Sequence, residues 1–293
     1  MKQEIEHRGK VIDYYNSAQR FYDRFWHGTL SGIGEKSYGL HYGFWDANVS
    51  SRREAILREN RILADMANVR PGDLVIDAGC GIGGSGFWLA KERGARIVGI
   101  DLVHKQLTEA DKLTKKKKLK DQIMFAQGDY QKLPTPSNSI DVFWSLESIE
   151  HATGIEALLG ESYRVLRHGG RAIIAGAFRG REFLSEEERR QLGVGFSAGG
   201  GSFDYFKTAD EVTNIMEETG FKDIESLDAT VWVMPSSREM ATMCRLFMTA
   251  AKFAVASHIV PKIMLDNQKW GIYQERLFRS GAISYNILVG QKL

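Results

Sequence analysis

The stretch that decides the fold runs Leu74-Val-Ile-Asp-Ala-Gly-Cys-Gly-Ile-Gly-Gly-Ser-Gly86. It opens with a short apolar run, breaks into glycines and continues into Phe87 and Trp88, which is the pattern of a buried strand, a tight turn and a helix start. The glycines at positions 79, 81 and 83 let the backbone pass close to a bound molecule, because they carry no Cβ atom. Free amides at the start of the helix can then hold a negatively charged or hydrogen-bonding group.

Asp77 separates two interpretations of this turn. Gly79, Gly81 and Gly84 also fit the spacing G-x-G-x-x-G of dinucleotide-binding turns. Asp77, however, lies two residues before the first glycine, where its carboxylate would repel a pyrophosphate. A carboxylate suits a cationic group at that place, such as the α-ammonium of S-adenosylmethionine. The residues therefore favour S-adenosylmethionine over a nicotinamide dinucleotide.

Length and composition set broad limits. The chain has 293 residues, of which 43% are hydrophobic and 26% charged, as in an ordinary globular protein. Its net charge of +2 gives no reason to expect a nucleic-acid partner. Cys80 lies inside the glycine turn, where a disulfide to Cys244 would be hard to accommodate, so a reducing, cytoplasmic location is expected. The N-terminal residues are polar, and no run of about 18 apolar residues occurs, so neither a secretory signal nor a membrane span is expected.

Strands and helices alternate after residue 72. The expected strands, after the one that opens at Leu74, are Arg96–Leu102, Ile123–Asp129, Ile140–Leu146 and Arg171–Phe178, with helices reaching Arg93 and covering 103–119 and 154–167. This order predicts a doubly wound parallel sheet, which binds ligands at the carboxyl ends of its strands. Asp77, Asp101, Asp129 and Glu147 all fall at such ends. We therefore expect these four side chains to lie around one site.

The flanking segments predict a helical cap. Residues 3–30 have an amphipathic, aromatic helical pattern, and a glycine-rich loop then leads to the aromatic cluster Leu40–Asp46, which suits a lid over an apolar pocket or a cover for a sheet edge. Later elements are expected at 51–69 (helix), 180–207 (irregular), 208–220 (helix), 224–233 (strand), 236–260 and 264–279 (helices) and 282–290 (strand). The long helix at 236–260 could cover a substrate pocket, lie on a membrane surface or be core. We thus expect a cap at 1–70 and a binding domain at 71–293 with a helical insertion at about 236–280.

Residues 70–180 resemble the cofactor half of class I S-adenosylmethionine-dependent methyltransferases. Their first motif, D/E-x-G-x-G-x-G, is carried here by Asp77, Gly79, Gly81 and Gly83. The resemblance implies an α/β, Rossmann-like fold with a seven-stranded, mostly parallel sheet and a helical cap, and S-adenosylmethionine as cofactor. It places Asp101 at the ribose, Asp129 and Tyr130 at the adenine, and Gly79, Gly81 and Leu146 at the methionine portion. Leu102, Gln106 and Tyr14 are expected to complete this site.

A narrower resemblance concerns Trp144-Ser-Leu-Glu-Ser-Ile-Glu-His151. It looks like a segment shared by tocopherol, sterol and prenyl-diphosphate C-methyltransferases, in which a Glu at the position of Glu147 lines the acceptor site. By the same resemblance the N-terminal region covers the cofactor and brings aromatic rings to a small lipophilic acceptor. The acceptor residues expected on this basis are Tyr15, Tyr42, Trp45 and Phe178. Natural-product O-methyltransferases share much of the pattern, so the methylated atom could be carbon, oxygen or nitrogen.

Glu147 and His151 are the catalytic candidates. Glu147 could act as a base or stabilise a cation, and His151, four residues on, would share its face if the segment were helical. Alternatively, Glu147 is a helix N-terminal residue, His151 a helix-terminal hydrogen-bonding group, and Glu150 a structural residue. The positively charged Arg179 and Arg181 could bind a diphosphate or belong to a solvated loop. No metal site is expected, and the sequence leaves the oligomeric state open. Peripheral contact with a membrane is possible. The alternative to an enzyme is a cofactor-binding protein without catalytic activity.

Overall fold

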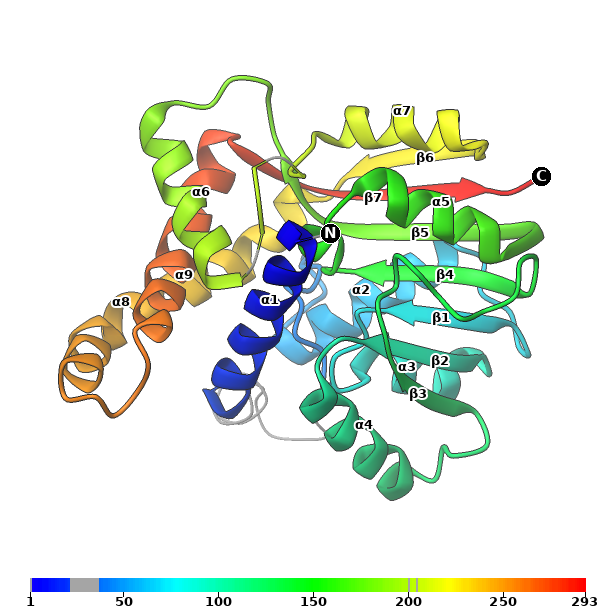
Figure 1. Cartoon of the computed structure of the whole chain (residues 1–293), viewed down its shortest axis with the longest axis horizontal. Coiled ribbons are helices and arrows are strands. Elements are labelled where there is room, and N and C mark those ends of the chain that lie inside the picture. The colour runs from blue at the N-terminus through cyan, green and yellow to red at the C-terminus, as the bar shows by residue number, and fades with distance from the viewer. Residues whose placement is uncertain (1, 22–36, 200, 204) are drawn as a thin grey trace.

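The computed structural model describes residues 2–21, 37–199, 201–203 and 205–293 (Figure 1). Its centre is a seven-stranded sheet in the order β3-β2-β1-β4-β5-β7-β6. The strands are β1 Leu74–Ala78, β2 Arg96–Asp101, β3 Ile123–Gln127, β4 Ile140–Leu146, β5 Leu166–Arg179, β6 Lys222–Asp228 and β7 Ile283–Gln291. Strands β1 to β5 are parallel, whereas β7 runs antiparallel to both β5 and β6. The expected seven-stranded, mostly parallel sheet is confirmed.

The chain order reverses between β1 and β4. From β1 the chain winds outward through β2 to β3, and then returns to place β4 on the other side of β1. Asp77 is opposite Gly99 of β2 and Trp144 of β4, so the carboxyl ends of these neighbouring strands meet at one edge. Open α/β sheets bind ligands at such a switch point.

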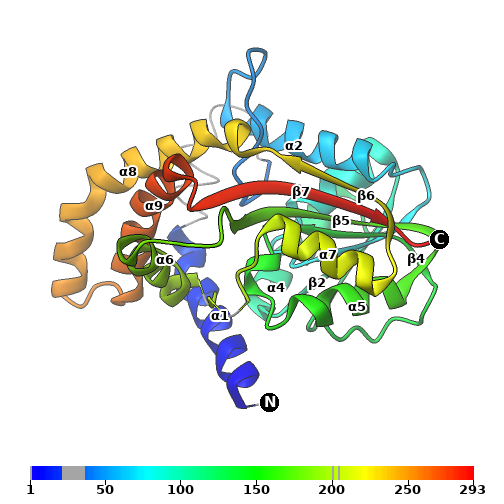
Figure 2. The same cartoon turned by 90° about the horizontal axis from the view of Figure 1, so that it is seen from above.

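Alternating side chains in the central strands build two cores. In β4, Val142 and Trp144 face one core and Phe143 the other, as the period of two in a strand requires. The first core is covered by α2 Arg52–Met66, α3 Gly84–Trp88 and α4 His104–Lys117, with the π-turn η2 Leu89–Arg93 after α3. The second is covered by α5 Ile155–Val165 and α7 Ala209–Thr219 (Figure 2). Although α2 lies within residues 1–70, its Leu63 packs in the first core, so this helix is part of the sheet's covering layer.

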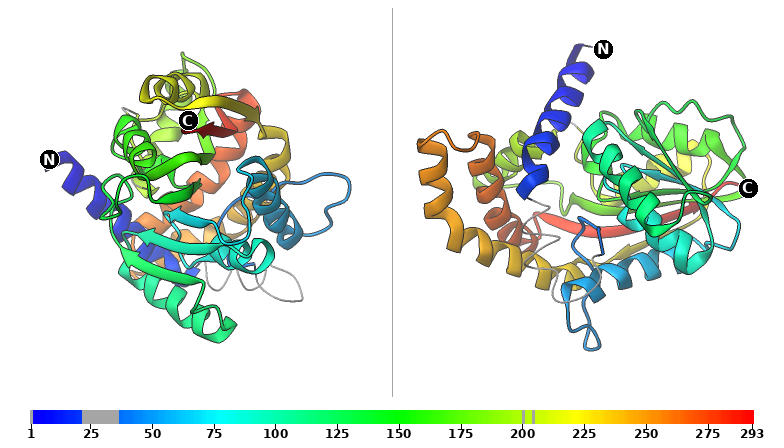
Figure 3. Two further views of the ribbon diagram at one scale, coloured as in Figure 1. Left: turned by 90° about the vertical axis from the view of Figure 1, so that its right-hand side faces the viewer. Right: turned by 90° about the horizontal axis from the view of Figure 1, so that it is seen from below.

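In the described part of the chain, four further helices gather beyond the carboxyl ends of the strands. They are α1 Lys2–Phe21, α6 Glu186–Gly199, α8 Thr230–Ala256 and α9 Ile263–Ser280. Figure 1 shows them beside one another, with α9 between α6 and α8. In the right-hand view of Figure 3, α1 (dark blue) lies between the other cap helices and the sheet. The helical cap therefore combines the N-terminal helix with segments from the second half of the chain. Within the described residues no helix is long and apolar enough to cross a membrane.

Some predicted elements were wrong. Residues 186–199 form a helix, not an irregular segment, and the signal for it is a capping pattern in which Ser185 Oγ accepts from Glu188 N while Ser185 N donates to Glu188 Oε2. The predicted strand 224–233 ends at Asp228, whose carboxylate accepts from Thr230 N at the start of α8. The part of the first predicted helix at 22–30 lies outside the described residues.

Candidate active site

The glycine turn after β1 is closed by backbone bonds to β2. The amide of Gly79 donates to the carbonyl of Ile100 at 2.8 Å, and Gly79 and Gly81 have φ of 79° and 54°. A Cβ atom on Gly79 would lie 2.5 Å from Cβ of Ser148, so a larger residue would collide with the loop after β4. Gly83 acts differently, because it caps α3 and a Cβ there would lie 2.9 Å from Phe125. It does not line the cavities described below.

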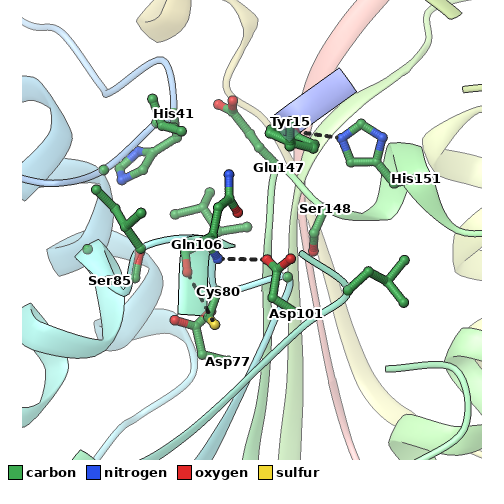
Figure 4. A pocket seen from close by; sticks show the side chains of 18 of the residues that line it. Tyr15, His41, Asp77, Cys80, Ser85, Asp101, Gln106, Glu147, Ser148 and His151 are labelled. Carbon is green, nitrogen blue, oxygen red and sulfur yellow. Dashed lines mark hydrogen bonds between the residues drawn. The ribbon is translucent and has the colours of Figure 1, made fainter. Parts of the chain in front are cut away.

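A cavity of about 110 Å³ opens above this turn (Figure 4). It lies at the carboxyl ends of β1, β2 and β4, where the sheet topology predicts a ligand. Its walls include the expected residues Asp77, Gly79, Gly81, Asp101, Leu102, Gln106, Tyr130 and Leu146, together with Val11, Tyr38, His41, Cys80, Ser85 and Ser148. A cradle of this composition fits S-adenosylmethionine, because it combines a close backbone approach, two acidic groups and apolar walls.

Asp77 and Asp101 form the acidic floor of this cavity. Both are at most 9% exposed, and the charge of Asp101 raises the electrostatic cost of ionising Asp77. Burial, with the nearby Asp101 carboxylate, raises the pKa of Asp77 to about 7. Asp101 accepts from Gly81 N at 2.9 Å and Val103 N at 2.8 Å, which opposes the upward shift that burial gives its pKa. A cationic group beside Asp77 would lower the cost of its charge.

Tyr130 and Ser148 fix the side of the cavity that faces β4. Tyr130 donates its hydroxyl to the carbonyl of Ser148 at 2.7 Å, and Ser148 Oγ donates to the carbonyl of Ala78 at 2.6 Å. These bonds join the ends of β1 and β4. Asp129 forms an ion pair with Arg8 of α1 and does not line the cavity, so it ties the cap to the sheet.

A second cavity of about 220 Å³ adjoins the first on the side of the cap helices. Its walls are mainly aromatic and aliphatic, and come from α1, α6, α8 and α9: Tyr14, Leu192, Phe196, Met240, Cys244, Asn267, Gln268 and Trp270, with Tyr42, Glu150, Ala177, Phe206 and Ile283. Of the residues that the structure describes, four line both cavities, namely Tyr15, Leu40, Glu147 and His151. These four therefore stand where the contents of the two cavities would meet.

Glu147 is held at this junction by backbone geometry and two donors. It follows β4 directly and has φ of 48°, in the left-handed region that non-glycine residues rarely adopt. Glu147 therefore precedes η3 Ile149–His151 and does not share a helical face with His151. Its Oε1 accepts from Tyr42 N at 2.8 Å and from Tyr285 Oη at 3.1 Å. Burial, then the charge of Glu59, raises the pKa of Glu147 well above the usual range of a glutamate.

His151 is paired with Tyr15 of the cap. Tyr15 Oη lies 2.9 Å from Nε2 of His151, and the rings meet edge to face. Burial lowers the pKa of His151 to about 4, so the ring is neutral at physiological pH. His7 lies 3.0 Å from the carbonyl of His151 through its Nε2 atom. A neutral imidazole and a phenol thus link α1 to the loop after β4.

Not every predicted acceptor residue reaches these cavities. Tyr15 and Tyr42 do, whereas Trp45 lies outside both and donates its indole N–H to Ser236 Oγ at 2.8 Å. Phe178 is 2% exposed in the second core, because it occupies the β5 face that α5 and α7 cover. Tyr14 was expected at the cofactor but lines the second cavity only. The predictions for Trp45, Phe178 and Tyr14 are corrected accordingly.

Charged residues bring two further findings. Arg179 and Arg181 are engaged with Glu211 and Glu188, and neither lines the two cavities. Glu150, interpreted from the sequence as structural, lines the second cavity, where its Oε1 accepts from Ala177 N at 2.6 Å. Burial raises the pKa of Glu150 to about 7. Among the described residues no cluster of three or more His, Cys, Asp or Glu side chains could hold a metal ion.

Comparisons with known proteins agree with this geometry. A methyltransferase-domain family model matches residues 76–174. The 27-O-demethylrifamycin SV methyltransferase of Amycolatopsis mediterranei is 30% identical over 202 residues, which cover 67% of this chain and 71% of that protein. The chain belongs to the class I S-adenosylmethionine-dependent methyltransferases.

Two other relatives of this methyltransferase extend the comparison. A sterol 24-C-methyltransferase of Gibberella zeae is 30% identical over 241 residues, covering 78% of this chain but only 59% of the fungal protein. The geranyl diphosphate C-methyltransferase of Streptomyces coelicolor A3(2), solved with Mg²⁺, geranyl diphosphate and S-adenosyl-L-homocysteine, has a TM-score of 0.73 and 19% identity, with 98% of each chain covered. The second similarity confirms the Rossmann-like methyltransferase fold.

Proposed function

We propose that this methyltransferase transfers a methyl group from S-adenosylmethionine to a carbon atom of a small, isoprenoid-like acceptor. The observation that carries the proposal is the position of Glu147, whose side chain lines both the acidic cavity above the glycine turn and the aromatic cavity under the cap. The relatives named for sterol and geranyl diphosphate C-methylation support the same class of acceptor.

The cofactor supplies an electrophilic methyl group when bound. The residues of the first cavity would bind and orient it: Asp77 would hold the α-ammonium, Asp101 would accept from the ribose hydroxyls, and the backbone of Gly79 and Gly81 would allow close approach. Methyl transfer is an in-line displacement that depends above all on alignment. The first cavity is therefore proposed to fix the donor, and the residues shared with the second to align the acceptor.

The second cavity suits a lipophilic acceptor with an alkene. The π electrons of that alkene would form the new bond to the methyl carbon while the bond from the methyl carbon to sulfur breaks. This leaves a carbocation on the acceptor. Aromatic faces such as those of Tyr15 and Trp270 can stabilise a cation, and the carboxylate of Glu147 would then take the adjacent proton and restore the alkene. The Tyr42 amide and Tyr285 hydroxyl hold this carboxylate in place.

A second candidate is O-methylation of a natural product. It is favoured by the similarity to 27-O-demethylrifamycin SV methyltransferase. In that case His151, held neutral by burial and oriented by Tyr15, could accept the proton of an acceptor hydroxyl. The two candidates give products that differ in the position of the new methyl group.

The cap is proposed to close the site over both substrates. Residues Val11, Tyr14 and Tyr15 of α1 line the cavities, and Arg8 pairs with Asp129 of the sheet domain. A lipophilic acceptor also suggests peripheral contact with a membrane surface, through exposed apolar side chains of α8 such as Leu246 and Phe253. Cys80 and Cys244 are free thiols, which is compatible with the cytoplasmic location that we propose.

The proposal is tested by incubating the protein with methyl-labelled S-adenosylmethionine and a panel of acceptors. The panel contains prenyl alcohols, prenyl diphosphates, sterols and hydroxylated aromatic natural products, and the products are mapped by mass spectrometry and NMR. We expect label on carbon of an isoprenoid acceptor. Label on oxygen would establish the second candidate, and exclusive methylation of RNA or protein would refute both.

A further inference from the structure

A chain of hydrogen bonds runs from Glu147 into the interior of the protein. Tyr285 of β7 donates its hydroxyl to Oε1 of Glu59 at 2.6 Å and also lies 3.1 Å from Oε1 of Glu147. Oε2 of Glu59, on α2, is in contact with Nδ1 of His41 and accepts from Gly43 N at 2.9 Å. Four residues from separate parts of the sequence thus form the network His41–Glu59–Tyr285–Glu147.

The inner members of this network are more deeply buried than Glu147 itself. Glu59 and Tyr285 are 0% exposed and His41 is 4% exposed. A buried carboxylate without partners is costly, and packing alone would be served better by an apolar side chain of similar volume. Among the described residues, the hydrogen-bond partners of Glu59 besides His41 are the Tyr285 hydroxyl, which also lies beside Glu147, and the amide of Gly43. The arrangement therefore points to a role in the site.

The phenol of Tyr285 has two carboxylates within hydrogen-bond distance. A hydroxyl carries a single hydrogen, so two ionised carboxylates must share it or compete for it. If Glu147 holds a proton, however, it can donate to the phenol oxygen while the phenol donates to Glu59. The proton content of Glu147 is in this way coupled to the charge of Glu59 through Tyr285.

The same network holds the backbone of residues 38–46, which contain the aromatic cluster and which we call the aromatic segment. Glu147 accepts from the amide of Tyr42, and Glu59 accepts from the amide of Gly43 and contacts the ring of His41. A Cβ atom on Gly84 would lie 2.5 Å from the carbonyl of Tyr38, so this segment also lies directly on the start of α3. The carboxylates of Glu59 and Glu147 therefore hold in position the aromatic segment, which contributes wall residues to both cavities.

We propose that His41, Glu59 and Tyr285 are positioning residues that hold Glu147 and set the pH range over which it exchanges a proton with the acceptor. The proposal depends on the proposed function in one respect, namely that Glu147 takes a proton from the acceptor. The groups that face Glu147 are Glu59 from α2, Tyr285 from β7, Glu150 and His151 from η3, and the amide of Tyr42.

Glu59 and Tyr285 act on Glu147 in opposite directions. The negative charge of Glu59 disfavours a second charge nearby and raises the pKa of Glu147. The hydrogen bond from Tyr285 favours the carboxylate and lowers the pKa of Glu147. Removing each in turn should therefore move the titration of Glu147 in opposite directions, which loss of packing would not do.

The experiment compares Glu59→Gln and Tyr285→Phe in the full-length protein. Carboxyl carbons are labelled with ¹³C-glutamate, and the Glu147 resonance is assigned as the signal absent from Glu147→Gln. We expect its titration midpoint to fall by about one pH unit in Glu59→Gln and to rise by about half to one unit in Tyr285→Phe. With a methylated acceptor in hand, the acidic limb of kcat should move the same way while the Kd of S-adenosylhomocysteine stays within about threefold.

Matched controls come from α5, away from both cavities. Glu161→Gln removes a carboxylate paired with Arg164, and Tyr163→Phe removes a phenol packed on Phe221. Both should leave the Glu147 midpoint unchanged, whatever they do to Tm.

Unmoved midpoints in Glu59→Gln and Tyr285→Phe, or shifts of the same sign, would overturn the network. Since the titration needs no acceptor, failure to methylate isoprenoids would contradict the proposed function alone. If Glu59→Gln does not fold, Tyr285→Phe carries the test, because a midpoint that fails to rise in that variant would by itself overturn the network.

Discussion

Asp77 is a buried carboxylate whose ionisation lowers stability, and we propose that it binds the ammonium of the cofactor. Its pKa is raised to about 7 in the folded protein, so the folded state binds the proton more tightly than the unfolded state does. For this group, stability is therefore highest at acidic pH and falls as pH rises from the unfolded value toward about 7. Above that range the Asp77 carboxylate is ionised and can bind a cation.

We predict from Asp77 that cofactor affinity depends on pH. A ligand ammonium requires the ionised form, so the Kd of S-adenosylhomocysteine should rise about tenfold between about pH 8 and about pH 6. In Asp77→Asn the affinity should be tens of fold weaker and this pH dependence should be lost, with a Tm at about pH 8 equal to or above that of the parent. Isothermal titration calorimetry and thermal melts measure both. An unchanged affinity in the Asn variant would remove Asp77 from the binding site.

We predict a different pattern for Glu147. Glu147→Gln retains the shape of the side chain and can keep its contact with the Tyr42 amide, but cannot take a proton. Turnover should fall by about 10²- to 10⁴-fold, with near-normal affinity for S-adenosylhomocysteine. Paired measurements of kcat and ligand Kd test this. A variant that turns over within about threefold of the parent would exclude Glu147 as the catalytic group.

At the residue scale, the sequence is most informative where backbone geometry demands one residue type. Asp77, Gly79 and Gly81 could be assigned to the turn because only small residues and a strand-end acid fit it; all three line the first cavity, and their roles toward a cofactor stay predictions. His41 and Ser148 were missed as cavity residues, since their places depend on segments far apart in the sequence. Phe178 was misplaced because alternation in β5 does not reveal which face meets the site.

At the scale of elements, α8 is the helix whose role the sequence left most open. Its first half is anchored, because Ser236 and Ala241 are 0% exposed and Ser236 donates to the carbonyl of Tyr42. Its second half presents Leu246 and Phe253, 70% and 69% exposed. Apolar periodicity predicted the helix, but it could not separate core, pocket and surface roles, because all three need an apolar face.

We predict that this exposed half of α8 contacts membranes. Burying Leu246 and Phe253 in a lipid surface would contribute about 1.5–3 kcal/mol each, so Leu246→Ser/Phe253→Ser should weaken binding to phosphatidylcholine vesicles at least about tenfold. Co-sedimentation with vesicles measures the effect. Val231→Ser, altered at a residue that is 73% exposed at the other end of the helix, is the control and should bind normally. Equal binding of all three proteins would contradict the prediction.

On the scale of the whole molecule, the sheet was predictable and the cavities were not. The order of strands and helices, with the handedness of parallel connections, leaves few ways to assemble residues 72–179. The second cavity instead combines α1, α6, α8 and α9 with a loop after β4. Long-range packing of this kind has no local pattern in the sequence, so the aromatic residues pointed to an apolar pocket without showing which of them would form it.

The final prediction follows from the wall that the two cavities share. Tyr15, Leu40, Glu147 and His151 contact both spaces, and Tyr15 brings α1 to His151. A ligand in the first cavity should order this wall and so reduce the entropy that an acceptor loses on binding. We expect saturating S-adenosylhomocysteine to lower the Kd of the acceptor at least about fivefold, with the reciprocal effect of equal size. Tyr15→Phe, which removes the bond to His151, should reduce this coupling while leaving cofactor affinity within about threefold. Calorimetric titrations of each ligand with and without the other measure the coupling. If the two ligands bind the parent protein independently, the shared wall does not couple their affinities.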